Sequence, residues 1–201
     1  QSFYPRDRRS QIRDSFSVAP DTGARDPLVF QFVKPNKQVT YSYSSEIRST
    51  TDQPMIKGPH EFPITILPSS AYQYLGPSAT IDSDHPEIKK VAKKLAANED
   101  DLLLVLAKTA SWVRNHVEYN LSTLTAEASQ KSSWVLENKQ GGCDEMTSLF
   151  IALLRAMGVP ARFIKGVSYT DNELFNSNWE PHGWAEVLIP GAGWVPFDVT
   201  F

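Results

Sequence analysis

The chain contains a single cysteine among its 201 residues. One cysteine cannot form an internal disulfide, a cysteine-rich zinc site or a cysteine-ligated iron–sulfur cluster. No apolar run approaches the roughly 18 residues that a membrane span needs, and the longest candidate covers only 102–107. The formal net charge is −3, so the charge balance gives no sign of a nucleic-acid partner.

The composition is that of an ordinary globular protein, with 41% hydrophobic and 21% charged residues. The chain opens on Gln1 rather than methionine and stops at Phe201, directly after a β-like stretch. We therefore expect a piece excised from a longer protein. Together with the arginine-bearing start, this favours an extracytoplasmic domain, attached to a membrane through segments outside this sequence, over a cytoplasmic one.

The two parts of the chain follow different patterns. Residues 26–80 are rich in proline and read as short strands, expected at 28–33, 39–47, 62–67 and 71–75. After Asp82 the apolar residues recur at helical spacing, which predicts helices entered at Pro86, at Asp100 or Asp101, and over 128–138. We therefore divide the chain into a β-rich N-terminal region, 1–80, and a core, 81–201.

The most informative stretch surrounds the cysteine. Two glycines precede Cys143, and Asp144 and Glu145 begin an amphipathic helix that should stop at Gly158. The N-terminus of a helix lowers the pKa of a thiol, and its backbone N–H groups can hold an oxyanion. On this placement alone, a reactive cysteine and a buried structural cysteine remain equally open.

A reactive thiol needs a base and a group that orients the base. His182 lies in a strand-like run, and a second run ends in Asp198 after a turn, which together predict a β-hairpin. Because side chains alternate between faces of a strand, His182 and Asp198 share a face only if the loop has an odd number of residues, such as 190–192. We therefore predict an odd loop or a bulge.

Four sequence motifs, found together in this order, point to a particular protein family. They are Gly-Gly-Cys143-Asp-Glu, Leu-Leu-Arg155-Ala-Met-Gly-Val-Pro-Ala-Arg162, His182-Gly-Trp-Ala-Glu-Val, and Gly-Trp-Val-Pro-Phe-Asp198-Val-Thr. Over residues 84–201 the chain resembles the transglutaminase-like superfamily. The resemblance implies an α+β, papain-like fold, in which a helical lobe packs on an antiparallel sheet. It also implies Cys143 as nucleophile, His182 as general base and acid, and Asp198 as orienting group. Arg162 is expected to be structural and paired with a carboxylate.

The expected cleft surrounds this triad. Gln140 is a candidate oxyanion donor, by analogy with the glutamine that precedes the cysteine in papain-like enzymes. The aromatic side chains that could line the substrate cleft are Tyr119, Trp134, Trp179 and Trp184. No metal is expected, because Cys143 and His182 lack further ligands at suitable spacing, and thiol acyl transfer needs no cofactor.

The predicted reaction is acyl transfer at an amide bond of a protein or peptide, through a thioester. Water as acceptor gives peptide or amide hydrolysis, which we favour, as in a cysteine protease. A lysine amine as acceptor gives cross-linking of protein glutamine, as in a protein-glutamine gamma-glutamyltransferase. A non-catalytic domain that binds a protein or the cell wall is the remaining alternative.

Overall fold

The computed structural model describes residues 56, 58–120, 129–169 and 179–200. The chain divides into two compact units, Gln1–Thr51 and Asp52–Phe201, and every described residue belongs to the second. Within these ranges no helix has the length and apolar character required to cross a membrane. The strands expected at 28–33 and 39–47 lie outside the described residues.

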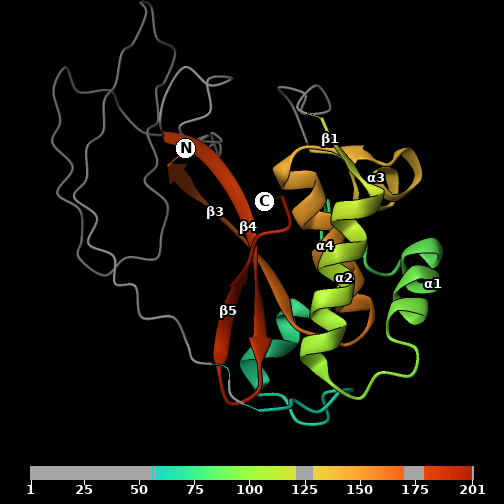
Figure 1. Ribbon diagram of the computed structural model, residues 1–201, viewed down its shortest axis with the longest axis vertical. Coiled ribbons are helices and arrows are strands. Elements are labelled where there is room, and N and C mark those ends of the chain that lie inside the picture. Colours follow the sequence, from blue (N-terminus) through green and yellow to red (C-terminus); the bar gives the residue numbers. More distant parts are fainter. Residues whose placement is uncertain (1–55, 57, 121–128, 170–178, 201) are drawn as a thin grey trace, which may run out of the picture. The chain divides into compact units, whose positions relative to one another are not determined.

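The described part of the chain combines helices and strands (Figure 1). The helices are a 3-10 helix, η1 (Ser69–Tyr74), and four α-helices, α1 (Pro86–Leu95), α2 (Leu102–His116), α3 (Ser132–Asn138) and α4 (Cys143–Ala156). The strands are β1 (Glu118–Tyr119), β2 (Gln140–Gly141), β3 (Ala161–Tyr169), β4 (Trp179–Ile189) and β5 (Gly193–Phe197). This is the mixed architecture that the sequence predicts.

The helix boundaries follow local chemistry. Proline is tolerated in the first turn of a helix, and α1 begins at Pro86. Asp101 caps α2, because its carboxylate accepts a hydrogen bond from the backbone N–H of Leu103 at 2.9 Å. Helix α4 ends before Gly158, which adopts a φ of +80° that favours glycine. The predicted helix over 128–138 is shorter in the structure and begins at Ser132.

Helix α4 forms the centre of the core. It packs against α1, α2 and α3 and also against β3 and β4, and Figure 1 shows these four α-helices gathered on one side of the β3–β5 sheet. Its apolar residues from Leu149 to Leu154 are fully buried. Burial on all sides explains why this helix carries an almost continuous apolar sequence rather than a narrow stripe.

The sheet is antiparallel, with the strand order β3-β4-β5. Ile189 pairs with Gly193 and Ala185 with Phe197, so the hairpin loop comprises residues 190–192, an odd number as predicted. Ala185, Val187 and Ile189 are buried, which assigns the odd-numbered positions of β4 to the core side of the sheet.

On the even-numbered face of the sheet, Arg162 forms the structural ion pair expected for it. Arg162 and Glu186 are partners in the register of β3 and β4, and their charged groups approach to 2.6 Å. The Arg162 guanidinium also lies 4.2 Å from the ring centroid of Trp194. This arrangement links all three strands on the face opposite α4.

Two predicted strands were wrong. Residues 62–67 contain no strand and 71–75 fall largely in η1. Phe62 and Ala71 are buried in the core. These apolar side chains therefore hold a loop and the η1 helix against the core and do not belong to a sheet. The segment is tied to the core by hydrogen bonds, including one of 2.7 Å from Arg155 to the Gly76 carbonyl. The division at residue 80 stays a prediction, because most of the N-terminal region lies outside the described residues.

Candidate active site

Cys143 is the first residue of α4, as the sequence predicts, and only 8% of its surface is exposed. A buried carboxylate fixes the part of the chain that precedes it. Glu145, which is 0% exposed, accepts hydrogen bonds from the backbone N–H groups of Gly142 at 2.8 Å and Gln130 at 3.0 Å. Buried polar groups are nearly always hydrogen-bonded in this way. Glu145 therefore fixes the backbone of the chain just before the cysteine.

The surroundings of the Cys143 thiol disfavour its charged form. Burial raises the pKa of Cys143, and the neighbouring carboxylate of Asp144 raises it further, although a hydrogen bond from the backbone N–H of Gly183 opposes this change. The helix N-terminus acts in the opposite direction, because its backbone N–H groups favour the thiolate. Desolvation and the adjacent negative charge outweigh the helix dipole, so the resting cysteine is held as a thiol.

Asp144 lies between the nucleophile and the sheet. Its Oδ1 atom accepts a hydrogen bond from the Cys143 thiol at 3.8 Å, and its Oδ2 atom lies 3.2 Å from the Nζ atom of Lys165 on β3. A Cβ atom at Gly183 would stand 2.6 Å from Asp144 Oδ1 and 2.5 Å from the ring of Phe163. Only glycine therefore allows β4 to approach the cysteine this closely.

His182 and Asp198 form the hydrogen-bonded pair that the hairpin parity predicts. The Nε2 atom of His182 lies 2.6 Å from Oδ2 of Asp198, and their side chains are 9% and 32% exposed. Oδ1 of Asp198 accepts two hydrogen bonds from Thr200, from its hydroxyl at 2.6 Å and its backbone N–H at 3.0 Å. The aspartate is thereby fixed at both oxygens.

The pairing of His182 with Asp198 determines the ionisation of the carboxyl group and the tautomer of the imidazole. Burial alone would raise the pKa of Asp198, but the hydrogen bonds from Thr200 and His182 outweigh it and lower the pKa below the ordinary value. An ionised carboxylate only accepts hydrogen bonds, so Nε2 of His182 carries the donated hydrogen. In the neutral ring, Nδ1 is then the basic atom.

The hydroxyl of Tyr119 lies within reach of the charges of the site. Burial raises the pKa of the Tyr119 hydroxyl, the charges of Cys143, Asp198 and Asp144 raise it further, and a hydrogen bond with the Cys143 side chain adds to the effect. The charges that act on Tyr119 come from α4 and from the segment after β5.

The remaining predicted cleft residues fall in different places. Trp184 stacks beside His182, with ring centroids 6.2 Å apart, and its ring covers Gly166, where a Cβ atom would stand 2.6 Å from it. Trp179 begins β4, and its side chain lies outside the described part of the structure. The side-chain oxygen of Gln140 accepts a hydrogen bond from Asn120 at 3.1 Å.

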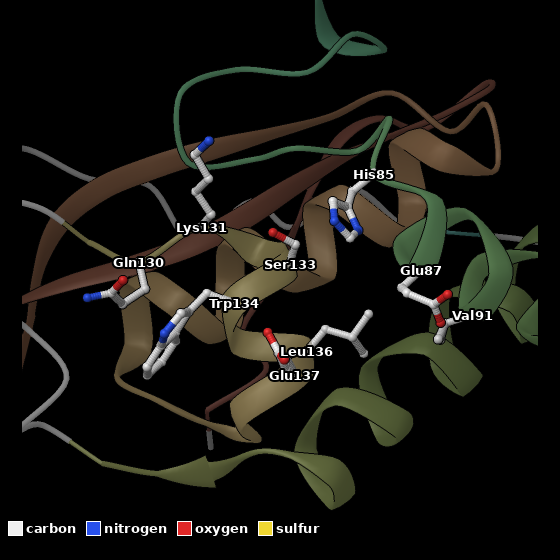
Figure 2. Close-up of a pocket in the computed structure, with 9 residues that line it drawn as sticks. All are labelled: His85, Glu87, Val91, Gln130, Lys131, Ser133, Trp134, Leu136 and Glu137. Atoms are coloured by element: carbon white, nitrogen blue, oxygen red, sulfur yellow. The ribbon is translucent and has the colours of Figure 1, made fainter.

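Trp134 lines a separate pocket between α1 and α3, whose lining includes none of Cys143, His182 and Asp198 (Figure 2). Its place in the substrate cleft stays a prediction, as do those of Trp179 and Trp184. Within residues 58–120, 129–169 and 179–200, no group of three or more histidine, cysteine, aspartate or glutamate residues could hold a metal ion.

Sequence reasoning missed Lys165 and Gly183 as parts of this site. The signal for Gly183 lies in the strand alternation, because residue 183 occupies the core-facing series that continues with Ala185 and Val187. A glycine in that series marks a close approach of another element. Lys165 gives no comparable signal, because its role depends on the register between β3 and β4.

Comparisons with proteins of known sequence give distant relatives. Over 134 residues, 59% of this chain, it is 28% identical to the uncharacterized protein YebA of Bacillus subtilis. Over 123 residues, 58% of this chain, it is 24% identical to a protein-glutamine gamma-glutamyltransferase of Pseudomonas aeruginosa. In both cases the match spans only 18% of the relative's length.

Solved structures share the fold. A protein of Cytophaga hutchinsonii, provisionally named a cysteine protease, matches 70% of this chain and 45% of its own with a TM-score of 0.60 and 26% identity. The periplasmic domain of TgpA from Pseudomonas aeruginosa, bound to ethylmercury, matches 67% of this chain and 50% of its own, with a TM-score of 0.51 and 23% identity. The second likeness concerns the fold alone.

The family model of the transglutaminase-like superfamily matches residues 89–199. This range includes the whole of α4, the β3–β5 sheet and Asp198, and therefore every residue of the candidate triad. Since the match covers more than half of the sequence, the chain belongs to the transglutaminase-like superfamily.

Proposed function

We propose that this protein transfers acyl groups from amide bonds, with Cys143 as nucleophile, His182 as general base and acid, and Asp198 as the group that orients His182. The observation that carries the proposal is the pairing of His182, on strand β4 of the sheet, with Asp198, because β4 packs against the helix that begins at Cys143. Gly183 directly follows His182, and His182 is held by Asp198 at 2.6 Å. Gly183 also approaches Asp144, the residue after Cys143, so closely that a Cβ atom at Gly183 would stand 2.6 Å from Oδ1 of Asp144.

The reaction begins from a neutral thiol. As the sulfur attacks the amide carbon, the thiol proton passes to Nδ1 of His182, and the carbonyl oxygen becomes an oxyanion. The C–N bond then breaks, the amine leaves with the proton from His182, and a thioester remains on Cys143. Asp198 stabilises the imidazolium without taking its proton, because its own pKa is lowered.

The molecule that accepts the acyl group determines whether the reaction is hydrolysis or cross-linking. We favour water, and thus hydrolysis of a peptide or another amide, in line with the likeness to the Cytophaga hutchinsonii structure. Cross-linking through a lysine amine is the alternative, favoured by the similarity to the Pseudomonas aeruginosa gamma-glutamyltransferase. The substrate in either case is a protein or a peptide. An extracytoplasmic location is part of the proposal, supported by the periplasmic origin of a structural neighbour.

A glutamine-containing peptide supplied to the purified chain, with and without a primary amine, tests both outcomes. Mass spectrometry distinguishes backbone cleavage and deamidation from amine incorporation. We expect cleavage or deamidation that is abolished in Cys143→Ala. Amine incorporation in preference to hydrolysis would replace the hydrolytic assignment by the cross-linking one. Activity that survives in Cys143→Ala would refute the thiol mechanism altogether.

A further inference from the structure

An exposed lysine of β3 lies beside the candidate nucleophile. In the register of β3 and β4, Lys165 is the partner of Gly183, the residue that follows His182. The Nζ atom of Lys165 lies 3.2 Å from Oδ2 of Asp144, and Oδ1 of the same carboxylate accepts a hydrogen bond from the Cys143 thiol at 3.8 Å. A single carboxylate therefore separates this ammonium group from the sulfur.

The ammonium is the accessible charge of this ion pair. The side chain of Lys165 is 67% exposed, whereas that of Asp144 is 21% exposed and has a partner at each of its oxygens. An ammonium group has three N–H donors, so the contact with Asp144 leaves donors for a second acceptor. Exposed ion pairs contribute little to stability, and the ammonium can therefore turn towards another carboxylate at small cost.

Two large exposed side chains continue the same face of β3. Because side chains alternate between the faces of a strand, Lys165, Val167 and Tyr169 share the face of Phe163, which packs against the core. Beyond Phe163 this face is open, since Val167 is 47% and Tyr169 is 63% exposed. Each step of two residues advances roughly 7 Å along the strand. The strand thus presents a cation beside the nucleophile, followed by apolar surface.

We propose that this face of β3, formed by Lys165, Val167 and Tyr169, binds an extended peptide substrate that carries a carboxylate close to the reacting amide and an apolar side chain two residues further on. Alternate side chains of an extended peptide lie on one face with the same spacing as those of β3. The substrate carboxylate then bonds the remaining donors of Lys165, while the apolar side chain packs on Val167. A basic group at the first position would be repelled by the ammonium. The inference rests on the proposed function and names its substrate class.

Glutamine peptides that carry glutamate, glutamine or lysine, in turn, on either side of the reacting glutamine test the charge selectivity. The wild type should favour the glutamate peptide over the glutamine peptide in kcat/KM by about 3- to 5-fold, the scale of one exposed ion pair, and should turn over the lysine peptide most slowly. Lys165→Met should abolish this order. Lys90→Met, which removes an exposed lysine with a comparable ion pair of 3.1 Å on α1, should keep it.

The ratio of kcat/KM between peptides separates recognition from reactivity. A change in the pKa of Cys143 affects all peptides of one variant alike, so it cancels in the ratio. A wild type without preference for glutamate, or a ratio that is the same in Lys165→Met and in the wild type, overturns the proposal.

Val167→Ser tests the apolar part of the surface, and Leu104→Ser, at a residue of α2 that is 51% exposed, is the control. The peptides here carry leucine or serine two residues beyond the glutamate. Val167→Ser should reduce the preference for the leucine peptide, while Leu104→Ser should leave it unchanged. An unchanged preference in Val167→Ser would show that the substrate does not follow β3 beyond Lys165.

A further readout needs no turnover. Iodoacetamide labels Cys143 alone because the chain has one cysteine, and a bound peptide shields the thiol. The glutamate peptide should slow alkylation more than the lysine peptide does in the wild type and in Lys90→Met, but not in Lys165→Met. Equal protection by the two peptides in the wild type overturns the inference. Failure of the wild type to turn over any amide would refute the proposed function instead, and the protection assay would still decide whether Lys165 binds the peptide.

Discussion

The carboxylate of Asp144 accepts a hydrogen bond from the thiol of Cys143, its neighbour in sequence, at 3.8 Å. The second oxygen of the same carboxylate lies 3.2 Å from Lys165. A negative charge beside a thiol disfavours the thiolate, and a positive charge nearby reduces this effect. The ionisation of Cys143 therefore depends on two charged side chains, Asp144 on α4 and Lys165 on β3.

Replacing Asp144 by asparagine should make Cys143 more reactive at neutral pH. The carboxylate raises the pKa of the thiol, so its removal lowers that pKa and shifts the alkylation profile to lower pH. Iodoacetamide, which labels Cys143 alone because the chain has one cysteine, should therefore react faster near pH 7 with Asp144→Asn than with the wild type. Glu87→Gln, on the exposed face of α1, is the control and should leave the profile unchanged. Equal profiles for wild type and Asp144→Asn would contradict this electrostatic assignment.

Replacing Lys165 by methionine should act in the opposite direction. The ammonium group of Lys165 partly neutralises Asp144, and without it the full negative charge faces the sulfur. The pKa of Cys143 then rises further, so alkylation near pH 7 becomes slower than in the wild type. The same alkylation assay measures this change, and faster alkylation in Lys165→Met would show that the lysine does not act through Asp144.

Replacing Asp198 by asparagine should reduce kcat by roughly 10²- to 10⁴-fold, because the asparagine can no longer hold the His182 tautomer as a carboxylate does. The same variant should reveal a pH-dependent stability. The pKa of Asp198 is lowered in the folded chain, so the carboxylate stabilises the fold above its ordinary pKa. That contribution is lost as the pH falls through the lowered value.

Thermal unfolding followed by circular dichroism tests this linkage. At pH 7 the wild type should melt at a higher temperature than Asp198→Asn, and the difference should shrink progressively below about pH 4, the ordinary range of an aspartate. Asp84→Asn, which replaces an exposed aspartate before α1, is the control. A difference in Tm that persists unchanged in acid would contradict the role of the ionised carboxylate.

Replacing Gly183 by alanine should destabilise the fold and displace Asp144. The added methyl group would meet the ring of Phe163 at 2.5 Å and Oδ1 of Asp144 at 2.6 Å. Overpacking of this kind costs about 1–3 kcal/mol, which lowers Tm measurably. Gly76→Ala, where no atom lies within 4 Å of the new carbon, should change Tm little. Equal melting temperatures for the two variants would show that β4 does not approach α4 so closely.

Replacing Glu145 by alanine should cost more stability than replacing an exposed glutamate. The buried carboxylate bonds the backbone N–H groups of Gly142 and Gln130, and each buried donor left without a partner costs about 1–3 kcal/mol. Chemical denaturation should show the loss, with Glu87→Ala as the exposed control. If the two variants have equal free energies of unfolding, Glu145 does not fix the approach to the nucleophile.

Local patterns predicted much of the helical and hairpin core. The helix after Cys143 and the odd loop between β4 and β5 follow from apolar spacing and from the two-residue period of strands. The same signals failed for 62–67 and 71–75, because apolar residues there anchor a proline-rich segment without joining a sheet. Periodicity does not distinguish these two uses of a short apolar run.

The chemical state of the site was less predictable. The pKa of Cys143 depends on how completely the thiol is desolvated, and this arises from packing between α4 and β4. The pairing of Tyr119 with Gly141, two residues before the cysteine, joins segments on either side of α3. Such long-range pairing leaves no trace in local spacing, so the sequence indicated an aromatic residue for the cleft without revealing which strand it pairs with.

The odd loop at residues 190–192 also limits how this hairpin can diverge. An insertion or deletion of one residue there would reverse the alternation of β5 against β4 and turn Asp198 away from His182. A change of two residues would preserve the alternation. Related proteins in which the aspartate still bonds the histidine should therefore keep an odd number of residues in this loop.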